Sequence, residues 1–167
     1  NARDDRIMQF AGQRTDMDLN PIGEPYNLLV KLNDDTLPSP EAVMVTGITP
    51  QSTLADGLTE AEIAELLINE VFVPETITVG FNNIRFDDEF MRHLFWRTFR
   101  DPYEWCWKES CSRWDMLDVI RMTRALRPEG IEWPVDEEGR PTNRLELITK
   151  ANGIGHDNAH DALSDVT

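Results

Sequence analysis

The most chemically suggestive pair in this 167-residue chain lies near its carboxyl end, in the stretch HDALSD. His160 precedes Asp165 by five positions in a helix-favouring segment. On a helix that advances about 100° per residue, these side chains lie about 140° apart, so both can border one cleft. Asp binds hard divalent cations through oxygen, and His, with a pKa of about 6.5, suits a general base. The pair is typical of metal-assisted hydrolysis, although most arbitrary H-x4-D pairs are structural or solvated.

A second group of chemically suggestive residues lies in VGFNNIRFDDEF. Asp87 follows a predicted strand and begins a predicted helix, and ligands of α/β proteins collect at the carboxyl ends of strands. Asn83 lies four positions before Asp87, and Phe86 directly precedes it. Asp88 and Glu89 adjoin Asp87 but fall on other faces of the helix, so we interpret both as solvated charges. The sequence therefore predicts that Asp87 lies at a site-forming junction.

The elements that must position these residues follow the hydrophobic pattern. Short apolar runs at 7–14 and 26–32, bounded by turn-rich segments, predict a hairpin. Helical spacing after Thr59, a plausible N-cap, predicts a helix through TEAEIAELLINEVF. Strands and helices interleave along the chain, which predicts an α/β or α+β fold. The other predicted elements are a strand in ETITVGF, a helix in DDEFMRHLFWRTF, a short strand or turn and then a helix within 113–126, a helix in LELITKANGIG, and a helix from 158 onward.

Composition limits the partners and the setting. The length fits one domain, and the formal net charge of -15 argues against a broad basic surface for nucleic acid. The chain contains no signal-peptide pattern and no apolar run of membrane-spanning length, so with its two cysteines we expect a reducing, cytoplasmic setting and no membrane association. Because the sequence starts at Asn1 and stops at Thr167 inside a helix-favouring stretch, we expect a fragment cut at both ends.

Aromatic and basic residues gather in the middle of the chain. Aromatic residues at helical or strand spacing are usually part of a core, so a core role is expected ahead of a base-stacking platform. Asp115 precedes a predicted helix and is interpreted as an N-cap or supporting group rather than a ligand. The cluster comprises Trp96, Trp105, Trp107 and Trp114 with Arg97, Arg100 and Arg113.

The strand, the Asn-x-x-Phe-Asp sequence, the helix and the distant H-x4-D together resemble the second and third motifs of the DEDDh 3′→5′ exonucleases. The resemblance extends to the exonuclease domain of the bacterial exodeoxyribonuclease I family, in order and nearly without gaps. It implies a ribonuclease H-like α/β fold, a mixed sheet flanked by helices, with residues 1–167 as a partial domain. It is carried by IGEP, VTGITPQ, GFNNIRFDDEFMRHLFWRTFRDPYEW, SRWDMLDVIRMTRALRPEGIEWP, RLELITKANGI and NAHDALSDV.

The resemblance also implies a role for particular residues. Asp87 and Asp165 would bind two Mg²⁺ ions, with Mn²⁺ as a substitute, and His160 would be the general base that deprotonates water. The implied activity releases nucleoside 5′-monophosphates from the 3′ end of single-stranded DNA, in DNA repair and recombination. A monomer that docks on single-stranded DNA-binding protein is also implied. The positions expected next to the terminal nucleotide are Thr46, Gly47, Ile48, Asn83 and Phe86.

One motif of this family has no counterpart in the sequence. The first motif is Asp-x-Glu on the first strand, and the chain begins with NARDDRIMQFA, which resembles the segment after that strand. Asp4 and Asp5 have neither the required spacing nor an apolar strand around them. A missing interior strand leaves backbone groups unpaired on its neighbours. We therefore expect residues 1–167 alone to be inactive and marginally stable.

Two alternatives remain open at this point. The first is another DEDDh exonuclease, such as a proofreading subunit or an RNA-trimming enzyme, because the motifs do not separate DNA from RNA. The second is a zinc-binding module without catalysis, in which Cys106, Cys111, His156 and His160 form a Cys2His2 site. The long separation of the two pairs and the unexplained Asp87 disfavour the zinc module.

Overall fold

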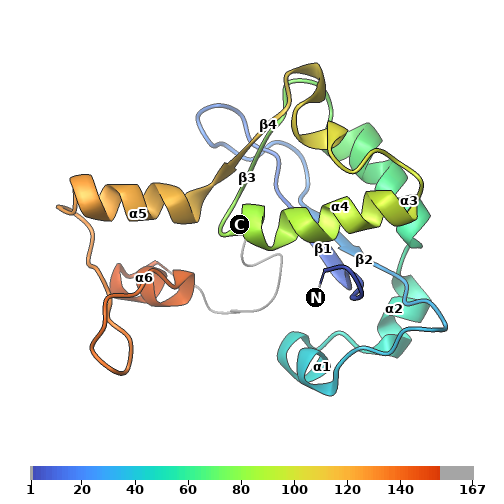
Figure 1. Ribbon diagram of the computed structural model, residues 1–167, viewed down its shortest axis with the longest axis horizontal. Helices are drawn as coiled ribbons and strands as arrows, with labels where there is room; N and C mark the ends of the chain where they lie inside the picture. Colours follow the sequence, from blue (N-terminus) through green and yellow to red (C-terminus); the bar gives the residue numbers. More distant parts are fainter. Residues whose placement is uncertain (1, 155–167) are drawn as a thin grey trace.

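The strands of the protein form two pairs (Figure 1), in a computed structural model that describes residues 2–154. β1 (Gln9–Gly12) and β2 (Tyr26–Leu29) form the predicted antiparallel hairpin. β3 (Ile77–Gly80) and β4 (Ser112–Asp115) pair in parallel. The α/β class is confirmed, but within the described residues the expected mixed sheet consists of two separate two-stranded sheets.

Two short helices between the hairpin and β3 were not predicted. α1 (Pro40–Thr46) and α2 (Pro50–Asp56) lie in a segment that reads as turn-rich. Each begins with a hydroxyl side chain that caps the helix, Ser39 and Thr49, followed by proline at the first helical position. This combination favours helix initiation, because proline has the required φ and the hydroxyl accepts a hydrogen bond from a backbone amide that would otherwise be unpaired.

The predicted helix after Thr59 is present and changes its winding part-way. α3 (Glu60–Leu66) is followed directly by a π-helical turn, Leu67–Val71. Thr59 caps α3 in a reciprocal capping box with Glu62: its side chain accepts from the Glu62 amide, and the Glu62 carboxylate accepts from the Thr59 amide at 2.8 Å. The cap orders the start of the helix that provides much of the core.

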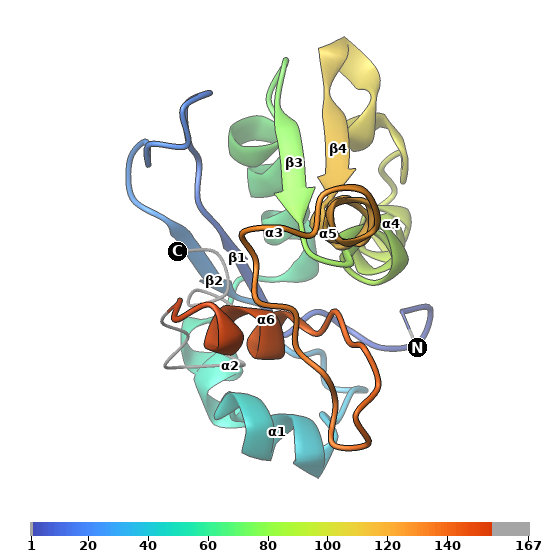
Figure 2. The same cartoon turned by 90° about the vertical axis from the view of Figure 1, so that its left-hand side faces the viewer.

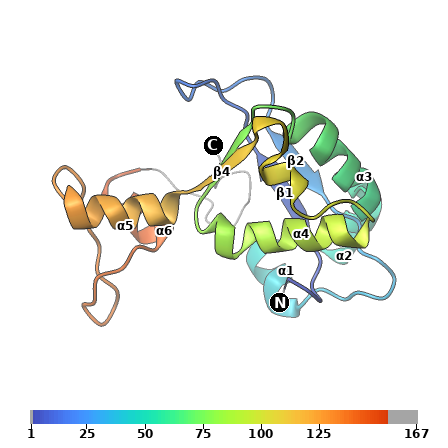
Figure 3. The same cartoon turned by 45° about the horizontal axis from the view of Figure 1, so that its top comes forward.

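Three further predicted helices are confirmed. α4 (Asp87–Arg97) follows β3, α5 (Met116–Leu126) follows β4, and α6 (Leu145–Ala151) is the last described helix. Figures 1 and 3 show α5 extending away from the body beyond the end of β4. The helix predicted from 158 onward lies outside the described residues. No helix in the described part of the chain is long and apolar enough to cross a membrane.

The core lies where α3, the π-helical turn and α4 meet. Phe72 packs against Trp105 with ring centroids 4.9 Å apart and against the edge of Phe95 at 6.3 Å. At the rim, the guanidinium of Arg97 pairs with both carboxylate oxygens of Glu60, which ties α4 to α3. This packing holds α4 rigidly and so fixes the direction in which its amino end points. The buried cluster consists of Val30, Ile63, Ala64, Leu67, Phe72, Met91, Leu94, Phe95 and Trp105.

Candidate active site

The candidate site lies where β3 and β4 end together. In the parallel register Gly80 is opposite Asp115, so both strands stop at the same level. β4 continues directly into α5, whereas β3 continues through a turn at 81–86 into α4. Asp87 is the first residue of α4, where a negative charge also suits the helix dipole. The prediction that Asp87 lies at a strand-to-helix junction is confirmed.

The turn before Asp87 needs unusual backbone geometry. Asn82 has φ 62° and ψ 18°, a left-handed conformation that Asn tolerates better than most residues. Asn83, a predicted substrate contact, is 4% exposed. In the orientation that satisfies its neighbours, its amide nitrogen donates to the carbonyl oxygens of Gly80 and Trp114, each at 3.1 Å. A Cβ at position 80 would lie 2.8 Å from the Cβ of Asn83, so this close turn requires glycine.

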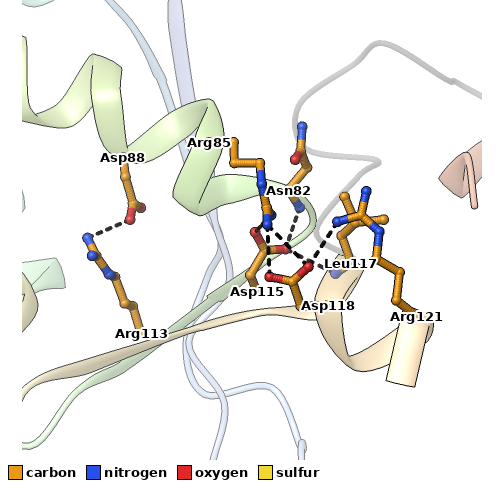
Figure 4. A network of polar contacts seen from close by, with 8 residues as sticks. All are labelled: Asn82, Arg85, Asp88, Arg113, Asp115, Leu117, Asp118 and Arg121. Carbon is orange, nitrogen blue, oxygen red and sulfur yellow. Dashed lines mark hydrogen bonds and ion pairs between the residues drawn. The ribbon is translucent and has the colours of Figure 1, made fainter. Parts of the chain in front are cut away.

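Asp115 ties the same turn to the start of α5 (Figure 4). Its Oδ1 accepts from the amide of Leu117 at 3.0 Å, which confirms the predicted N-cap, and from the amide of Asn82 at 2.8 Å. Its Oδ2 lies 3.5 Å from Arg85, which also pairs with Asp118 at 3.2 Å. The motif-based interpretation did not single out Arg85, because its partners come about 30 residues later in the chain.

Asp87 combines an exposed surface with a partly dehydrated carboxyl. Desolvation by the surrounding protein is the main cause that raises its pKa, and the negative charges of Asp88 and Asp115 raise it further. Its own backbone amide acts in the opposite direction. A carboxylate whose ionised form is disfavoured by burial and by like charges gains from a bound cation, so these surroundings suit a metal ligand.

Asp88 is not the solvated charge that the helical spacing suggested. It is 2% exposed, and its carboxylate pairs with Arg113 of β4 at 2.7 Å (Figure 4). Burial raises the pKa of Asp88, and Arg113 opposes that rise. Glu89 retains an accessible side chain and pairs with Arg92. The prediction was wrong for Asp88 because the helix face it occupies is covered by a strand that lies 25 residues later.

Phe86 is the exposed neighbour of the candidate ligand. Its side chain is 58% exposed and leans on Phe90 of α4 with ring centroids 5.1 Å apart. Phe86 and Asn83 therefore lie beside Asp87, one facing solvent and the other buried beneath the turn. Their contacts with substrate stay predictions.

Thr46, Gly47 and Ile48 lie in another part of the molecule. They form the end of α1, where Gly47 has φ 70° and its amide donates to the carbonyl oxygen of Val43. The Thr46 hydroxyl donates to the carbonyl oxygen of Ala42 at 2.8 Å and accepts from the Ile48 amide. Figures 1 and 2 place α1 and α2 at one end of the molecule and β3 and β4 at the other. A contact between these residues and the terminal nucleotide stays a prediction.

The remaining predicted site residues, His160 and Asp165, lie outside residues 2–154. Within residues 2–154, no three His, Cys, Asp or Glu side chains are grouped so that they could hold a metal ion. Asp87 is thus the predicted ligand for which the structure supplies surroundings. The proposed ligand set depends on Asp165 joining it.

The tryptophans divide between the core and the surface. Trp105 is 7% exposed and belongs to the core, as predicted, but Trp96, Trp107 and Trp114 are exposed. The core interpretation was therefore wrong for these three. Arg97 and Arg113 have carboxylate partners, Glu60 and Asp88, so they brace the fold rather than a stacking surface.

The two cysteines lie against backbone oxygens. The Sγ of Cys106 lies 3.0 Å from the carbonyl oxygen of Tyr103, and that of Cys111 lies 3.3 Å from the carbonyl oxygen of Val73. Each sulfur is therefore placed to donate to a backbone oxygen, whereas the sulfur of a zinc ligand bonds the metal. The histidines of the zinc alternative, His156 and His160, are not among the described residues.

Comparison with known proteins decides the family. The sequence profile of the family described as Exonuclease matches residues 1–167. The chain belongs to the exonuclease family. Members of this family use divalent metal ions. This exonuclease domain is 55% identical over 166 residues to Exodeoxyribonuclease I of Haemophilus influenzae and 54% identical over 162 residues to that of Escherichia coli. The matches cover 99% and 97% of the domain but 35% and 34% of these relatives, so the chain spans about a third of their length.

Solved structures agree with this assignment. The exonuclease domain matches Exonuclease I from Methylocaldum szegediense with a TM-score of 0.93 and 57% identity, over 99% of this chain and 35% of that one. It matches E. coli Exonuclease I in complex with a dT13 oligonucleotide with a TM-score of 0.94 and 53% identity, over 99% and 36% of the chains. An ExoI/SSB-Ct complex matches with a TM-score of 0.92 and 51% identity, over the same shares. The predicted ribonuclease H-like exonuclease fold is confirmed.

Proposed function

We propose that the complete protein containing this domain is a 3′→5′ exodeoxyribonuclease that releases nucleoside 5′-monophosphates from single-stranded DNA. The observation that carries the proposal is Asp87, presented in an Asn-x-x-Phe-Asp turn at the common end of β3 and β4. The curated relatives cited above, 55% and 54% identical, are each named Exodeoxyribonuclease I. The activity belongs to the complete protein, because residues 1–167 span about a third of these relatives.

Asp87 and Asp165 would hold the divalent metal, which we propose is Mg²⁺ with Mn²⁺ as a substitute. The donor type fits, because Mg²⁺ prefers carboxylate oxygen, and the dehydrated carboxyl of Asp87 lies near two other acidic groups. When bound, two such ions supply Lewis-acid activation of water and charge stabilisation of the leaving 3′ oxygen. His160 would accept the proton from the attacking water, for which a pKa near neutrality is suited.

The substrate is proposed to approach Asp87 over Phe86. An exposed aromatic ring can stack on a base, which contributes about 1 to 3 kcal/mol per base to single-strand binding. Asn83 would act from beneath by supporting the turn, while Thr46, Gly47 and Ile48 would contact the terminal nucleotide from α1. A net charge of -15 is compatible with this substrate when bound cations neutralise phosphate at the site.

The proposed partners are the 3′ end of single-stranded DNA and a single-stranded DNA-binding protein, with the enzyme acting as a monomer in the cytoplasm. The solved relatives that support these partners are a complex with dT13 and a complex with SSB-Ct. A DNA substrate is favoured over RNA by the same dT13 complex.

The proposal is tested with a full-length hybrid, in which residues 1–167 replace the aligned segment of the H. influenzae relative. With Mg²⁺ and a 5′-labelled single strand, we expect stepwise shortening from the 3′ end. The same assay is run on an RNA of matched sequence and on a His160→Ala hybrid. We expect His160→Ala to slow shortening by about 10² or more, the usual size of a general-base contribution. A preference for RNA, or equal rates with and without His160, would contradict the proposal.

A further inference from the structure

We propose that Asp115 is a positioning residue for the metal site, acting through the turn that carries Asp87. The inference rests on the proposed role of Asp87 as a metal ligand. Asp115 itself lies at the end of β4, opposite Gly80 in the neighbouring strand. Its carboxylate bonds both to the turn that follows β3 and to the start of α5, which follows β4. These bonds set the position of the turn and therefore the position of the Asp87 carboxylate.

Two backbone amides share one carboxylate oxygen of Asp115. One oxygen of Asp115, Oδ1, accepts from the amide of Leu117 at 3.0 Å and from the amide of Asn82 at 2.8 Å. A helix cap requires the bond to Leu117 alone. The bond to Asn82 crosses to the other connection, 33 residues away in sequence, and stabilises a left-handed residue. The second bond therefore does something that capping does not explain.

Asp115 is the buried member of this network. The Asp115 side chain is 2% exposed, whereas its ionic partner Arg85 is 52% exposed and Asp118, on the far side of Arg85, is 50% exposed. Arg121 extends the series by pairing with Asp118 at 2.9 Å (Figure 4). Exposed pairs contribute little by themselves, so the buried carboxylate with its two amide donors carries the restraint. Asp118 and Arg121 mainly hold Arg85 near Oδ2 of Asp115.

Only a short segment of chain separates Asn82, which is bonded to Asp115, from Asp87. Asn82 is followed by a single 3-10 turn, Asn83–Arg85, then Phe86 and Asp87. Asn83 is tied to the same strand ends through Gly80 and Trp114. Downstream, α4 is anchored in the core, so the turn has little freedom while Asn82 is held. Releasing Asn82 frees the segment that leads directly into the Asp87 backbone.

The decisive variant keeps the cap of α5 and removes the hydrogen bond from the Asn82 amide. In Asp115→Ser the shorter hydroxyl still caps α5 but cannot serve both amides and carries no charge for Arg85. Asp115→Asn keeps an oxygen at the shared position and tests rescue. Asp136→Ser is the matched control, since Asp136 accepts from the amides of Glu138 and Arg140 at 3.0 and 2.9 Å in the loop before α6. All three are made in the full-length hybrid.

Two readouts separate positioning from capping. Amide hydrogen exchange over residues 81–87 reports the turn directly, and Mn²⁺ binding, followed by electron paramagnetic resonance without DNA, reports the ligand. For Asp115→Ser we expect exchange in the turn to be at least about ten-fold faster and the Mn²⁺ dissociation constant to rise by about 10- to 100-fold, as for other groups that orient metal ligands. Asp115→Asn should stay within about three-fold of the parent in both readouts.

Each other result has a defined meaning. Unchanged exchange over 81–87 in Asp115→Ser, or an effect no larger than that of Asp136→Ser, overturns the positioning role. Faster exchange with unchanged Mn²⁺ affinity shows that Asp115 only stabilises the turn, which also overturns the proposal. A parent hybrid that neither binds Mn²⁺ nor shortens DNA defeats the proposed function instead, and the exchange comparison still decides whether Asp115 holds the turn.

Discussion

At the scale of residues, Asp87 and Asp88 are neighbours with opposite surroundings. Asp87 has an exposed surface, and within residues 2–154 no cationic side chain pairs with its carboxyl, whereas Asp88 is buried against Arg113. Sequence spacing distinguished their helix faces but could not show that a strand covers one of them. The functional assignment of Asp87 came from its motif, while the structural role of Asp88 required the tertiary contact with Arg113.

The ion pair of Asp88 leads to a pH-dependent stability prediction. Arg113→Met removes the ion pair of the buried Asp88 carboxylate and should lower the free energy of unfolding by about 2 kcal/mol at pH 7. Burial already raises the pKa of Asp88, so its ionised form costs stability above that pKa and the cost disappears as pH falls towards 3.8. Denaturant unfolding of the parent hybrid and of its Arg113→Met variant at pH 7 and near pH 4 checks this. The loss of unfolding free energy caused by the substitution should be smaller at the lower pH.

A matched arginine on the surface serves as the control for that measurement. Arg140 pairs with Asp136 at 2.8 Å but is 67% exposed, so Arg140→Met should leave the unfolding midpoint nearly unchanged at either pH. Equal losses for Arg113→Met and Arg140→Met would show that burial of Asp88 is not what makes its ion pair matter.

The ionised carboxylate of Asp87 should lower the stability of the fold when no metal is bound. The pKa of its carboxyl is raised above 3.8, mainly by desolvation, so the folded state favours the protonated form. Stability from this group is complete below the unfolded pKa and is lost as pH rises through the folded value. In EDTA, Asp87→Asn should therefore melt at a higher temperature than the parent hybrid at pH 7 and at the same temperature near pH 3.5. Calorimetry measures both melting temperatures. A melting temperature of Asp87→Asn at pH 7 that is equal to or below that of the parent would show that the Asp87 carboxylate does not destabilise the fold.

At the scale of elements, segments with an apolar period were predictable and two helices without one were not. The hairpin, α3, α4, α5 and α6 follow apolar patterns. α1 and α2 have seven residues each, as α3 and α6 do, but α1 buries none of its side chains and α2 buries Thr53 alone, so no apolar period marks them. The available signal was Ser39-Pro40 and Thr49-Pro50, in which a capping residue precedes proline.

Two helix caps should differ in their effect because their helices pack differently. Thr59→Ala removes the capping box of α3, which buries Ile63 and Ala64, and should lower global stability by about 1 kcal/mol. Ser39→Ala removes an equivalent bond from α1, which has no buried residue, so it should loosen that helix without changing the global unfolding midpoint. Urea unfolding measures the first effect, and amide exchange in 40–46 measures the second. A global loss from Ser39→Ala as large as that from Thr59→Ala would show that α1 is coupled to the core.

At the scale of the whole molecule, the fold was predictable through family resemblance more than through pattern. The interleaved elements indicated α/β or α+β, and the exonuclease resemblance narrowed this to the fold that the solved relatives share. The separation into two strand pairs could not be predicted, because pairing partners depend on tertiary placement. The surface positions of Trp96, Trp107 and Trp114 were missed for the same reason.

The domain alone should not perform the reaction. Within residues 2–154 no group of three potential metal ligands exists, and the first Asp-x-Glu motif of the family has no counterpart in the sequence. We expect residues 1–167 to leave 5′-labelled single-stranded DNA intact under conditions in which the full-length hybrid shortens it. Circular dichroism of the isolated domain shows whether it is folded in the assay. Shortening by the purified domain at a rate near that of the hybrid would contradict this expectation.

In the proposed function, Asp87 provides a metal-binding carboxylate for removal of nucleotides from a 3′ end. The deciding experiment compares the parent hybrid with Asp87→Asn and with Asp136→Asn, an aspartate that pairs with Arg140 in the loop before α6, on 5′-labelled single-stranded DNA across a range of Mg²⁺ concentrations. A lost metal ligand removes several kcal/mol of transition-state stabilisation, so the rate of shortening by Asp87→Asn should be lower by at least about 10² at every concentration, while that of Asp136→Asn stays within about two-fold of the parent. Equal rates for Asp87→Asn and the parent would contradict the proposed role of Asp87.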